Sequence, residues 1–398
     1  MLIIIRHVLY LIITLPVCRL CIVLPLIVSC NDPTRAASTI RIEWKTALPI
    51  FGVQAATAQN GDILVCGYKR VDNLNGIPAV ALVTSAGVHQ WTREYSDLEL
   101  YQITWVDSLV DGGIVAVAST KASFASKSDV CVLRMNNEGA VIWVNIYGGP
   151  GMEHGLSIEE TSNRELLVCG VTNSFGAGET DAYVLRLAST GSVVWERTYG
   201  GEGSEGQYDD GPRAFETKDG GFVVVGCSNS KSINKQGAAT AVYVVRADVR
   251  GEKLWERSYG IAGGCDIGSS AIELEDGGLL IAGTRYNVRN GLYAIRTNTL
   301  GEVLWEKTIP VMGVDGHVQA VQSLKNGYIL GNQETRWRTR IGYICNIGRN
   351  GEICWEKYLE QELSNRVVHV TRQLGEGGGQ IALCIGPERE SFIIKFRE

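Results

Sequence analysis

A glycine that is followed four residues later by a tryptophan recurs six times in this chain, and the interval between copies is nearly constant. Successive tryptophans of the pattern lie 50 to 60 residues apart. A repeat of this length is typical of propellers and solenoids, in which each repeat packs only against its neighbours. The six pairs are Gly87/Trp91, Gly139/Trp143, Gly191/Trp195, Gly251/Trp255, Gly301/Trp305 and Gly351/Trp355.

Each period contains the sequence signals of four short strands. The strand segments are rich in Val, Ile and Tyr, and glycine or polar clusters separate them. Asp-Gly-Gly runs fall between the second and third segments, where glycine supplies the positive φ that tight hairpins require. In the copy that contains Trp143, the segments cover residues 141–147, 156–160, 165–170 and 182–188, and the Asp-Gly-Gly runs lie at 111–113, 219–221 and 276–278.

Trp44 fits the spacing but lacks the preceding glycine turn, because position 40 is Ile. Its strand, residues 40–46, therefore begins without a partner. Residues 391–397 match the strand that precedes the glycine turn in other repeats. We expect these two segments to pair, since closure leaves only short, protected sheet edges. The sequence thus predicts an all-β, seven-bladed β-propeller over residues 40–398, built from four-stranded antiparallel blades and closed by pairing the N-terminal strand with the C-terminal blade.

The repeated tryptophan is expected to wedge between neighbouring blades, where a buried indole contributes roughly 3 to 5 kcal/mol. Glutamates follow four of the tryptophans, and arginines recur on the fourth strand, so we expect ion pairs between blades. The structural tryptophans are Trp44, Trp91, Trp143, Trp195, Trp255, Trp305 and Trp355; the charged residues are Glu196, Glu256, Glu306, Glu356, Arg134, Arg186, Arg246 and Arg296.

The spacing from glycine to tryptophan and the Tyr-Gly-Gly that follows, as in Trp195 to Gly201, resemble the tryptophan-docked repeats of quinoprotein-like propellers. The resemblance covers residues 40–398 and is strongest to secreted bacterial and archaeal proteins with Trp-Glu-Arg-Thr-Tyr-Gly-Gly repeats. It implies the propeller fold. It does not select an activity, because such propellers serve as enzymes, scaffolds and binding platforms. Quinoprotein dehydrogenases typically have eight blades, whereas seven are predicted here.

Residues 1–29 are almost entirely apolar and end in Ile-Val-Ser before Cys30. They resemble a bacterial lipoprotein signal peptide, which implies that Cys30 becomes the lipid-bearing first residue. An uncleaved membrane anchor is the alternative, but Arg19 interrupts the run of about twenty apolar residues that a span requires. Residues 30–39 are then a polar tether. We expect a lipoprotein of a bacterial cell envelope, attached to the outer membrane or cell surface through Cys30.

The formal net charge is -6, and removal of residues 1–29 takes away two arginines, which leaves 35 basic against 43 acidic residues, or -8. This balance argues against a nucleic-acid partner. Eight cysteines lie outside the leader. Cys66 and Cys169 occupy the same place in two different blades, too far apart for the roughly 7 Å between α-carbons that a disulfide allows. We therefore expect small buried thiols rather than disulfides.

The long, variable connections of the blades share one face, and function on repeat scaffolds tends to lie in such loops. Acids and histidines enter the innermost strands on this face. They could meet around the channel mouth and bind a divalent metal or act as general acids and bases. Alternatively, each acid hydrogen-bonds the local backbone. The metal candidates are Glu153, His154, Asp266, Asp315, His317 and His369; Asp209 and Asp210 enter blade four in the same way.

A second candidate site combines arginines with aromatic residues in two adjacent blades. Guanidinium groups with aromatic rings suit anionic glycans, carboxylates or an acidic protein surface. Trp337 is one of two tryptophans outside the period. A solvated loop with an indole that covers a blade edge is the alternative. The ligand-binding candidates are Arg285, Tyr286, Arg289, Arg336, Trp337, Arg338 and Arg340.

The chain has no haem-attachment motif, no adjacent cysteine pair, no phosphate-binding glycine loop that opens a helix and no Gly-x-Ser-x-Gly elbow. We therefore assign no catalytic residue and no cofactor, and hypothesise a lipid-anchored envelope propeller that binds or scaffolds a protein or glycan. The alternative is a propeller enzyme of the polysaccharide lyase or hydrolase type, with a metal and histidine site at the channel mouth. A quinone-dependent dehydrogenase is the third hypothesis, against which the missing motifs count.

Overall fold

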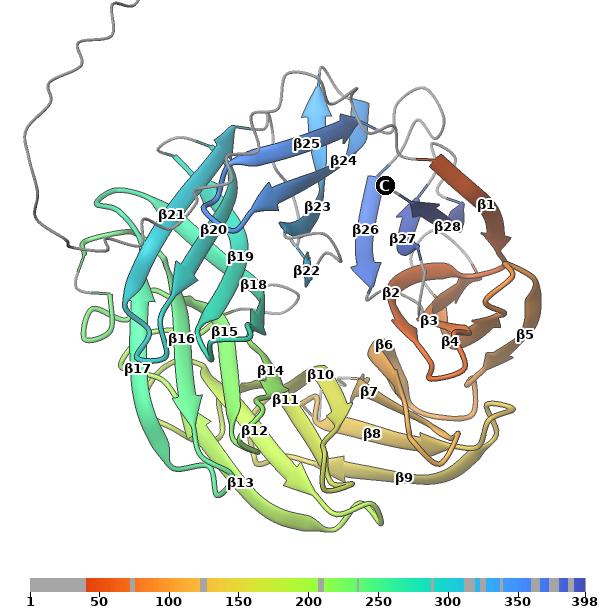
Figure 1. The fold of residues 1–398 in the computed structure, drawn as a ribbon. Helices are drawn as coiled ribbons and strands as arrows, with labels where there is room; N and C mark the ends of the chain where they lie inside the picture. The colour runs from red at the N-terminus through yellow and green to blue at the C-terminus, as the bar shows by residue number, and fades with distance from the viewer. Residues whose placement is uncertain are drawn as a thin grey trace, which may run out of the picture. The chain divides into compact units, whose positions relative to one another are not determined.

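The computed structural model describes residues 41–71, 76–121, 127–206, 211–234, 236–287, 290–310, 319–322, 327–336, 339–358, 366–371, 379–385 and 390–397. These residues form seven four-stranded antiparallel sheets, and no helix occurs among them. Figure 1 shows the sheets as blades around a ring, with the first strand of each blade toward the centre. The predicted all-β, seven-bladed propeller is confirmed.

We name the blades A to G. Blade A contains β2 (Phe51–Thr57), β3 (Ile63–Arg70), β4 (Gly76–Val83) and β5 (His89–Glu94). Blade B contains β6 (Leu100–Ser108), β7 (Ile114–Thr120), β8 (Val130–Met135) and β9 (Val141–Tyr147). Blade C contains β10 (Glu153–Glu160), β11 (Leu166–Thr172), β12 (Asp181–Leu187) and β13 (Val193–Tyr199). Blade D contains β14 (Arg213–Glu216), β15 (Phe222–Ser228), β16 (Ala241–Ala247) and β17 (Lys253–Tyr259).

Blade E contains β18 (Cys265–Glu273), β19 (Leu279–Tyr286), β20 (Gly291–Thr297) and β21 (Val303–Pro310). Blade F contains β22 (Gln319–Gln322), β23 (Gly327–Arg336), β24 (Thr339–Gly348) and β25 (Ile353–Tyr358). Blade G contains β26 (Arg366–Thr371), β27 (Gln380–Ile385), β28 (Ser391–Arg397) and β1 (Arg41–Leu48). The tryptophan strand is thus the outermost strand of each blade.

Blade G contains the predicted seam between the two ends of the propeller. β1 pairs with β28 in antiparallel register, with Arg41 opposite Arg397 and Leu48 opposite Ser391. Across the seam to blade A, the backbone N–H of Gly52 donates to Ser391 Oγ at 2.9 Å. The expected closure of the ring by its N-terminal strand is therefore confirmed.

Two faces of the propeller differ in their connections. On the turn face, short turns join the first strand to the second and the third to the fourth. On the loop face lie the connections from the second strand to the third and from each blade to the next. The turn face carries the regular glycines, and six glycines in the turns before the outer strands have φ values of 74 to 86°. Since β1 runs antiparallel to β28, it begins on the turn face.

Six of the seven docking tryptophans pack against the glycine turn of the next blade, and Trp355 packs against the apolar cluster shared with blade G. A Cβ atom added to Gly301 would lie 2.9 Å from the Trp255 ring, and one added to Gly87 would lie 2.6 Å from Trp44. Indole N–H groups complete the contact, as where Trp255 Nε1 donates to Thr299 O at 3.1 Å. The same turn also accepts a hydrogen bond from a tyrosine, since the hydroxyl of Tyr259 donates to Gly301 O at 2.7 Å. The expected wedge between blades is confirmed.

The predicted ion pairs between these glutamates and arginines are wrong for the described residues. The glutamates after the tryptophans accept hydrogen bonds from tyrosine hydroxyls of the neighbouring strand in the same blade, as Glu356 does from Tyr343 at 2.7 Å. The arginines turn toward acids of the first hairpin in their own blade, as Arg246 does toward Asp219 at 2.6 Å. Most of these contacts stiffen individual blades, and one of the arginines, Arg186, also forms an ion pair with Glu216 of the next blade at 3.7 Å.

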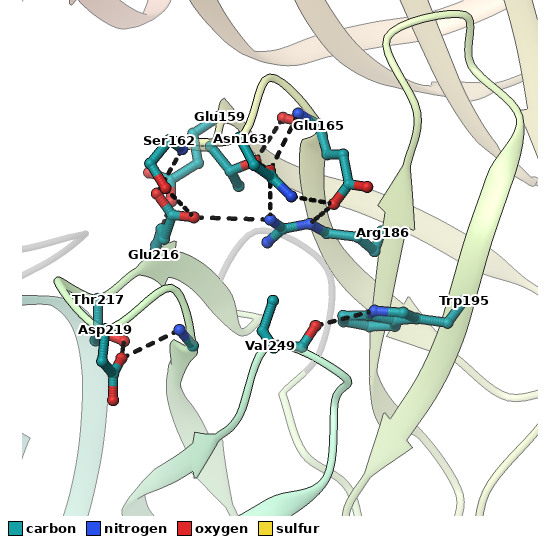
Figure 2. A network of polar contacts seen from close by, with 12 residues as sticks. Glu159, Ser162, Asn163, Glu165, Arg186, Trp195, Glu216, Thr217, Asp219 and Val249 are labelled. Carbon is teal, nitrogen blue, oxygen red and sulfur yellow. Dashed lines mark hydrogen bonds and ion pairs between the residues drawn. The ribbon is translucent and has the colours of Figure 1, made fainter.

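Carboxylates at the ends of inner strands join the blades on the turn face instead. Figure 2 shows the junction of blades C and D, where Ser162 N donates to Glu216 at 2.7 Å. Equivalent bonds run from Val110 N to Glu160 at 2.6 Å and from Lys218 N to Glu273 at 2.7 Å. Each bond places an acid of one blade on a turn of the preceding blade, which aligns successive inner strands.

The apolar cores lie between adjacent blades rather than within one. Leu167 and Cys169 of blade C cluster with Phe222 and Tyr243 of blade D, all at most 1% exposed. No disulfide joins the eight cysteines outside the leader, all of which the structure describes, and six of them are buried. The part of the chain that the structure describes contains no helix long and apolar enough to span a membrane. The predicted signal peptide, tether and Cys30 lie outside the described residues.

Substitution Trp255→Ala should lower the free energy of unfolding by about 2 to 4 kcal/mol, because it empties an inter-blade contact and removes the bond to Thr299. Denaturant unfolding measures the loss. Leu254→Ala is the matched control, since the neighbouring Leu254 is 58% exposed and its truncation should change stability by less than about 0.5 kcal/mol. Equal effects of the two variants would refute the docking role.

Candidate functional site

Two of the predicted acids, Glu153 and Asp266, are described, and both lie at the loop-face start of an innermost strand, where they make hydrogen bonds within the propeller. Glu153 begins β10 and its side chain is fully buried. Its carboxylate accepts hydrogen bonds from Thr172 Oγ1 at 2.6 Å and from Gly149 N at 2.8 Å. Because Gly149 belongs to the connection that arrives from blade B, the carboxylate fastens this connection to blade C.

A second carboxylate faces Glu153 from the preceding blade. Asp129 directly precedes β8, and burial together with the adjacent Glu153 raises the pKa of Asp129. Both carboxylates crowd the backbone of Gly148, where any side chain would overlap them. The first glycine of the Tyr-Gly-Gly sequence thus makes room for an acid pair.

The same arrangement recurs between blades C and D. Glu205 accepts hydrogen bonds from Ser228 Oγ at 2.7 Å and from Gly201 N at 3.2 Å. Burial raises the pKa of Glu205 to about 7, and the charge of the nearby Asp181 adds to this shift. Asp181 is itself buried, which raises its pKa, and it accepts backbone hydrogen bonds from residues 177 and 178 at 3.0 and 3.1 Å.

Between blades D and E the pair is rebuilt with opposite charges. Asp266 accepts a backbone hydrogen bond from Ile261 at 3.3 Å, as its counterparts do from Gly149 and Gly201. The residue across from it on β19 is Arg285, whose Nε donates to Asp266 at 2.7 Å. Ala241 stands where the other junctions have Asp129 or Asp181. A buried cation thus replaces the second acid.

The other described contacts of the Arg285 side chain are also with residues of its own blade. Its Nη1 donates to Thr308 Oγ1 at 3.1 Å, and its guanidinium carbon lies 3.7 Å from the centre of the Tyr293 ring. The side chain is only 4% exposed. Arg285 and Asp266 belong to two different candidate sites predicted from the sequence, and the structure brings them together as an ion pair.

Of the three histidine candidates, the structure describes the side chain of His154 alone. His154 is buried, and its Nδ1 lies 2.6 Å from Ser119 Oγ. His369 lies on β26 opposite Leu383. Asp315, His317, Asp209 and Asp210 lie outside the described residues. Among the residues that the structure describes, no three Asp, Glu, His or Cys side chains are arranged to hold a metal ion.

The arginine and aromatic candidates of blades E and F are only partly described. Tyr286 ends β19 and is half-buried. Arg289, Trp337 and Arg338 lie outside the described residues. The backbones of Arg336 and Arg340 are described, and they belong to the ends of β23 and β24, where Arg336 pairs with Thr339 and Thr335 with Arg340.

Asp129, Asp181, Glu205 and Trp105 are not among the residues singled out from the sequence. The repeated acid one residue before or at the start of the third strand, in Ser-Asp-Val and Thr-Asp-Ala, is the signal that could have revealed the pairs. Trp105 lies on the inner strand β6, and the guanidinium carbon of Arg213 on β14 lies 5.8 Å from its ring centre. Blade C separates the two strands in sequence, so only the ring arrangement explains this contact.

No protein-family model matches the chain, and no curated protein is significantly similar to it. Solved structures share the fold at low sequence identity. An ulvan lyase of the polysaccharide lyase family PL25 aligns with 12% identity and a TM-score of 0.58, covering 88% of this chain and 92% of that one. BBS1N, in a complex with ARL6DN, aligns with 10% identity and a TM-score of 0.54, covering 90% and 97%.

Glu205 should make the stability of the propeller depend on pH. A pKa raised from 4.5 to about 7 on folding means that its contribution is fully present below pH 4.5 and is lost as the pH rises through about 7. Glu205→Gln should therefore change the melting temperature little at pH 5 and raise it at pH 8. Glu202→Gln, in the same loop but exposed, is the control and should show neither effect.

Arg285→Ala should destabilise the protein by about 3 to 5 kcal/mol, because it leaves the buried carboxylate of Asp266 without its cation. The double variant Asp266→Ala/Arg285→Ala removes both charges and should be more stable than the single variant in denaturant unfolding. A stable Arg285→Ala protein that has lost affinity for a ligand would instead support the predicted binding role.

Glu153, Glu205, Asp266 and His154 thus hold neighbouring blades together, whereas Arg285 makes its contacts within blade E, and the likeness to solved structures is one of fold alone.

Proposed function

We propose that this protein is a lipid-anchored, non-enzymatic propeller of a bacterial cell envelope that binds an anionic protein or glycan through its loop face. The anchor is a lipid on Cys30. The recognition element is the hairpin of blade F that ends in Arg336, Trp337, Arg338 and Arg340. The following observations support this proposal.

The main support for the proposal is the length of the two strands that form the blade F hairpin. β23 and β24 each contain ten residues, and two residues join them. The equivalent strands of blade C contain seven residues each, and eight residues connect them. Paired strands position their ends more rigidly than a long connection does. A binding element on strands also loses less conformational freedom when a ligand arrives.

The composition of this hairpin end indicates the ligand class. Three arginines and one tryptophan occur within residues 336–340. A guanidinium group binds carboxylate, sulfate or phosphate through two parallel hydrogen bonds and also stacks on flat surfaces. Aromatic side chains and arginine dominate the energetics of many binding surfaces. We therefore infer a ligand that carries anionic groups.

Propellers of similar fold serve both classes of partner named here. The ulvan lyase has been solved with a bound unit of glucuronate and sulfated rhamnose, written [GlcA(1-4)Rha3S], and BBS1N with the protein ARL6DN. At 10 to 12% identity these examples show that the fold accommodates either ligand. For the enzyme alternative, His154 offers little support, because it is 7% exposed and contacts Ser119.

The triple variant Arg336→Ala/Trp337→Ala/Arg338→Ala tests the recognition element. We expect it to weaken binding of an acidic polysaccharide, or of the protein cross-linked to the wild type in cells, by at least about tenfold, because it removes two cations and an aromatic surface. Titration calorimetry or surface plasmon resonance measures the affinity.

Arg70→Ala is the matched control, since Arg70 is an exposed arginine at the same end of the equivalent hairpin in blade A. Its affinity should equal that of the wild type. Unchanged affinity in the triple variant would contradict the proposal for this hairpin. Degradation of the polysaccharide by the wild type would contradict the non-enzymatic function.

A further inference from the structure

The exposed apolar side chains of the propeller concentrate on its turn face. The described residues include sixteen large apolar side chains with high exposure, and twelve of them lie in a turn-face turn or at the first two positions of an outer strand. Ile142, Leu254 and Leu304 each directly precede a docking tryptophan and are 58 to 60% exposed. Soluble monomers rarely expose apolar residues in one large group, and such groups mark interaction surfaces.

These side chains form an arc rather than a full ring. The two residues before the docking tryptophan include an exposed apolar residue in blades B, C, D, E and F. In blade A the same positions hold His89 and Gln90. In blade G they are Ile42 and Glu43, and Ile42 packs against a core cluster. At these two positions five consecutive blades therefore present apolar side chains and the two blades beside the seam do not, although blade A exposes Val88 in the turn before its outer strand.

The chain that precedes the propeller enters at the sector that lacks these side chains. β1 begins at Arg41 on the turn face of blade G. Eleven residue steps separate Arg41 from Cys30, so a lipid on Cys30 cannot be farther than roughly 40 Å from the start of β1. Because the propeller begins on the turn face of blade G, a membrane on that side is the one that the short tether favours.

Six acids of the turn face are paired or hydrogen-bonded within the protein. Its first-hairpin acids form ion pairs with arginines, as Asp111 does with Arg134 at 2.6 Å. Asp219 and Asp276 are paired in the same way. Glu160, Glu216 and Glu273 accept backbone hydrogen bonds of the preceding blade. Pairing of these acids lowers the repulsion between this face and an anionic lipid surface.

We infer that the turn face of blades B to F docks on the lipid bilayer that holds the anchor. This inference rests on the proposed lipid at Cys30. The lipid secures the sector of blades G and A, and the apolar side chains of the other five blades enter the interfacial region of the bilayer. Apolar side chains in the interfacial region would add their own membrane affinity to that of the lipid. Docking in this way points the loop face, with the hairpin of blade F, away from the membrane.

Cys354 provides a native reporter for the test. It is exposed and follows Ile353 at the start of β25, within the apolar arc. Full-length protein, purified from membranes, is reconstituted into vesicles of phosphatidylethanolamine and phosphatidylglycerol. Peptide mass spectrometry then follows its reaction with a charged, impermeant maleimide. We expect the reaction at Cys354 to be at least about tenfold slower in vesicles than in detergent. A cysteine introduced by Val71→Cys on the loop face should react equally in both.

A matched pair of variants isolates the apolar contact. Ile142→Ser/Leu254→Ser/Leu304→Ser should restore fast reaction of Cys354 in vesicles, because it removes three side chains of the arc. Ile146→Ser is the control. Ile146 lies on the same strand as Ile142 and is as exposed, at 59%, but it is near the loop-face end. Equal reaction of Cys354 in vesicles and detergent, with the acyl chain on Cys30 confirmed by mass spectrometry, would overturn the docking inference.

The same mass spectrum separates this inference from the proposed anchor. A chain without lipid on Cys30 contradicts the anchor. If that chain still floats with vesicles, and the triple serine variant does not, docking through the turn face stands without the lipid. If neither floats, both the anchor and the docking are refuted.

Discussion

The contact between an indole and a glycine in the next blade is the interaction on which this propeller depends. A docking tryptophan can lie flat on the following turn only because that turn has no side chain, as at Gly301 beneath Trp255. The glycine must also adopt positive φ, so both requirements fall on one residue. The indole N–H and a tyrosine hydroxyl then bond to carbonyls of the same turn. Each repeat of the sequence therefore builds one blade and sets its orientation relative to the next blade. Repetition of this step closes the ring.

The contact between tryptophan and glycine is the same in successive blades, but the junctions between blades on the loop face differ in the charge of their buried side chains. Each of these junctions still holds the connection that arrives from the previous blade. A buried acid holds the connection from the previous blade in three junctions: Glu153 and Asp266 at the start of an inner strand, and Glu205 in the loop that precedes β14. Two junctions place a second acid beside it, which raises pKa values, and the third replaces that acid with an arginine. Burial of either arrangement costs desolvation, and backbone hydrogen bonds offset part of it. On the turn face, by contrast, acids lie near the surface and form ion pairs with arginines.

The fold could be predicted from the sequence because its determinants are local and periodic, whereas the site contacts depend on strand register. The tryptophan spacing gave the number of blades, and the isolated strand of Trp44 gave the closure. The predicted ion pair between Glu196 and an arginine is wrong, because the hydroxyl of Tyr183 on the adjacent strand donates to the Glu196 carboxylate at 2.6 Å. Asp266 and Arg285 are direct cross-strand partners. Their pairing could not be read without knowing which residues of β18 and β19 oppose each other. The ligand-binding role of the residues around Trp337 remains a prediction.

The seam in blade G imposes an order on synthesis. β1 emerges from the ribosome first, but its backbone partner β28 emerges last, since Leu48 pairs with Ser391. At translation rates of 5 to 20 residues per second, β1 waits roughly 20 to 70 s for its sheet. Its tryptophan does not need to wait, because Trp44 docks on the Gly87 turn of blade A and Thr46 bonds to the same glycine. Blade A, once made, can therefore hold the nascent N-terminal strand in place and shield its edge until the final strand arrives, so that the first blade assists the assembly of the last.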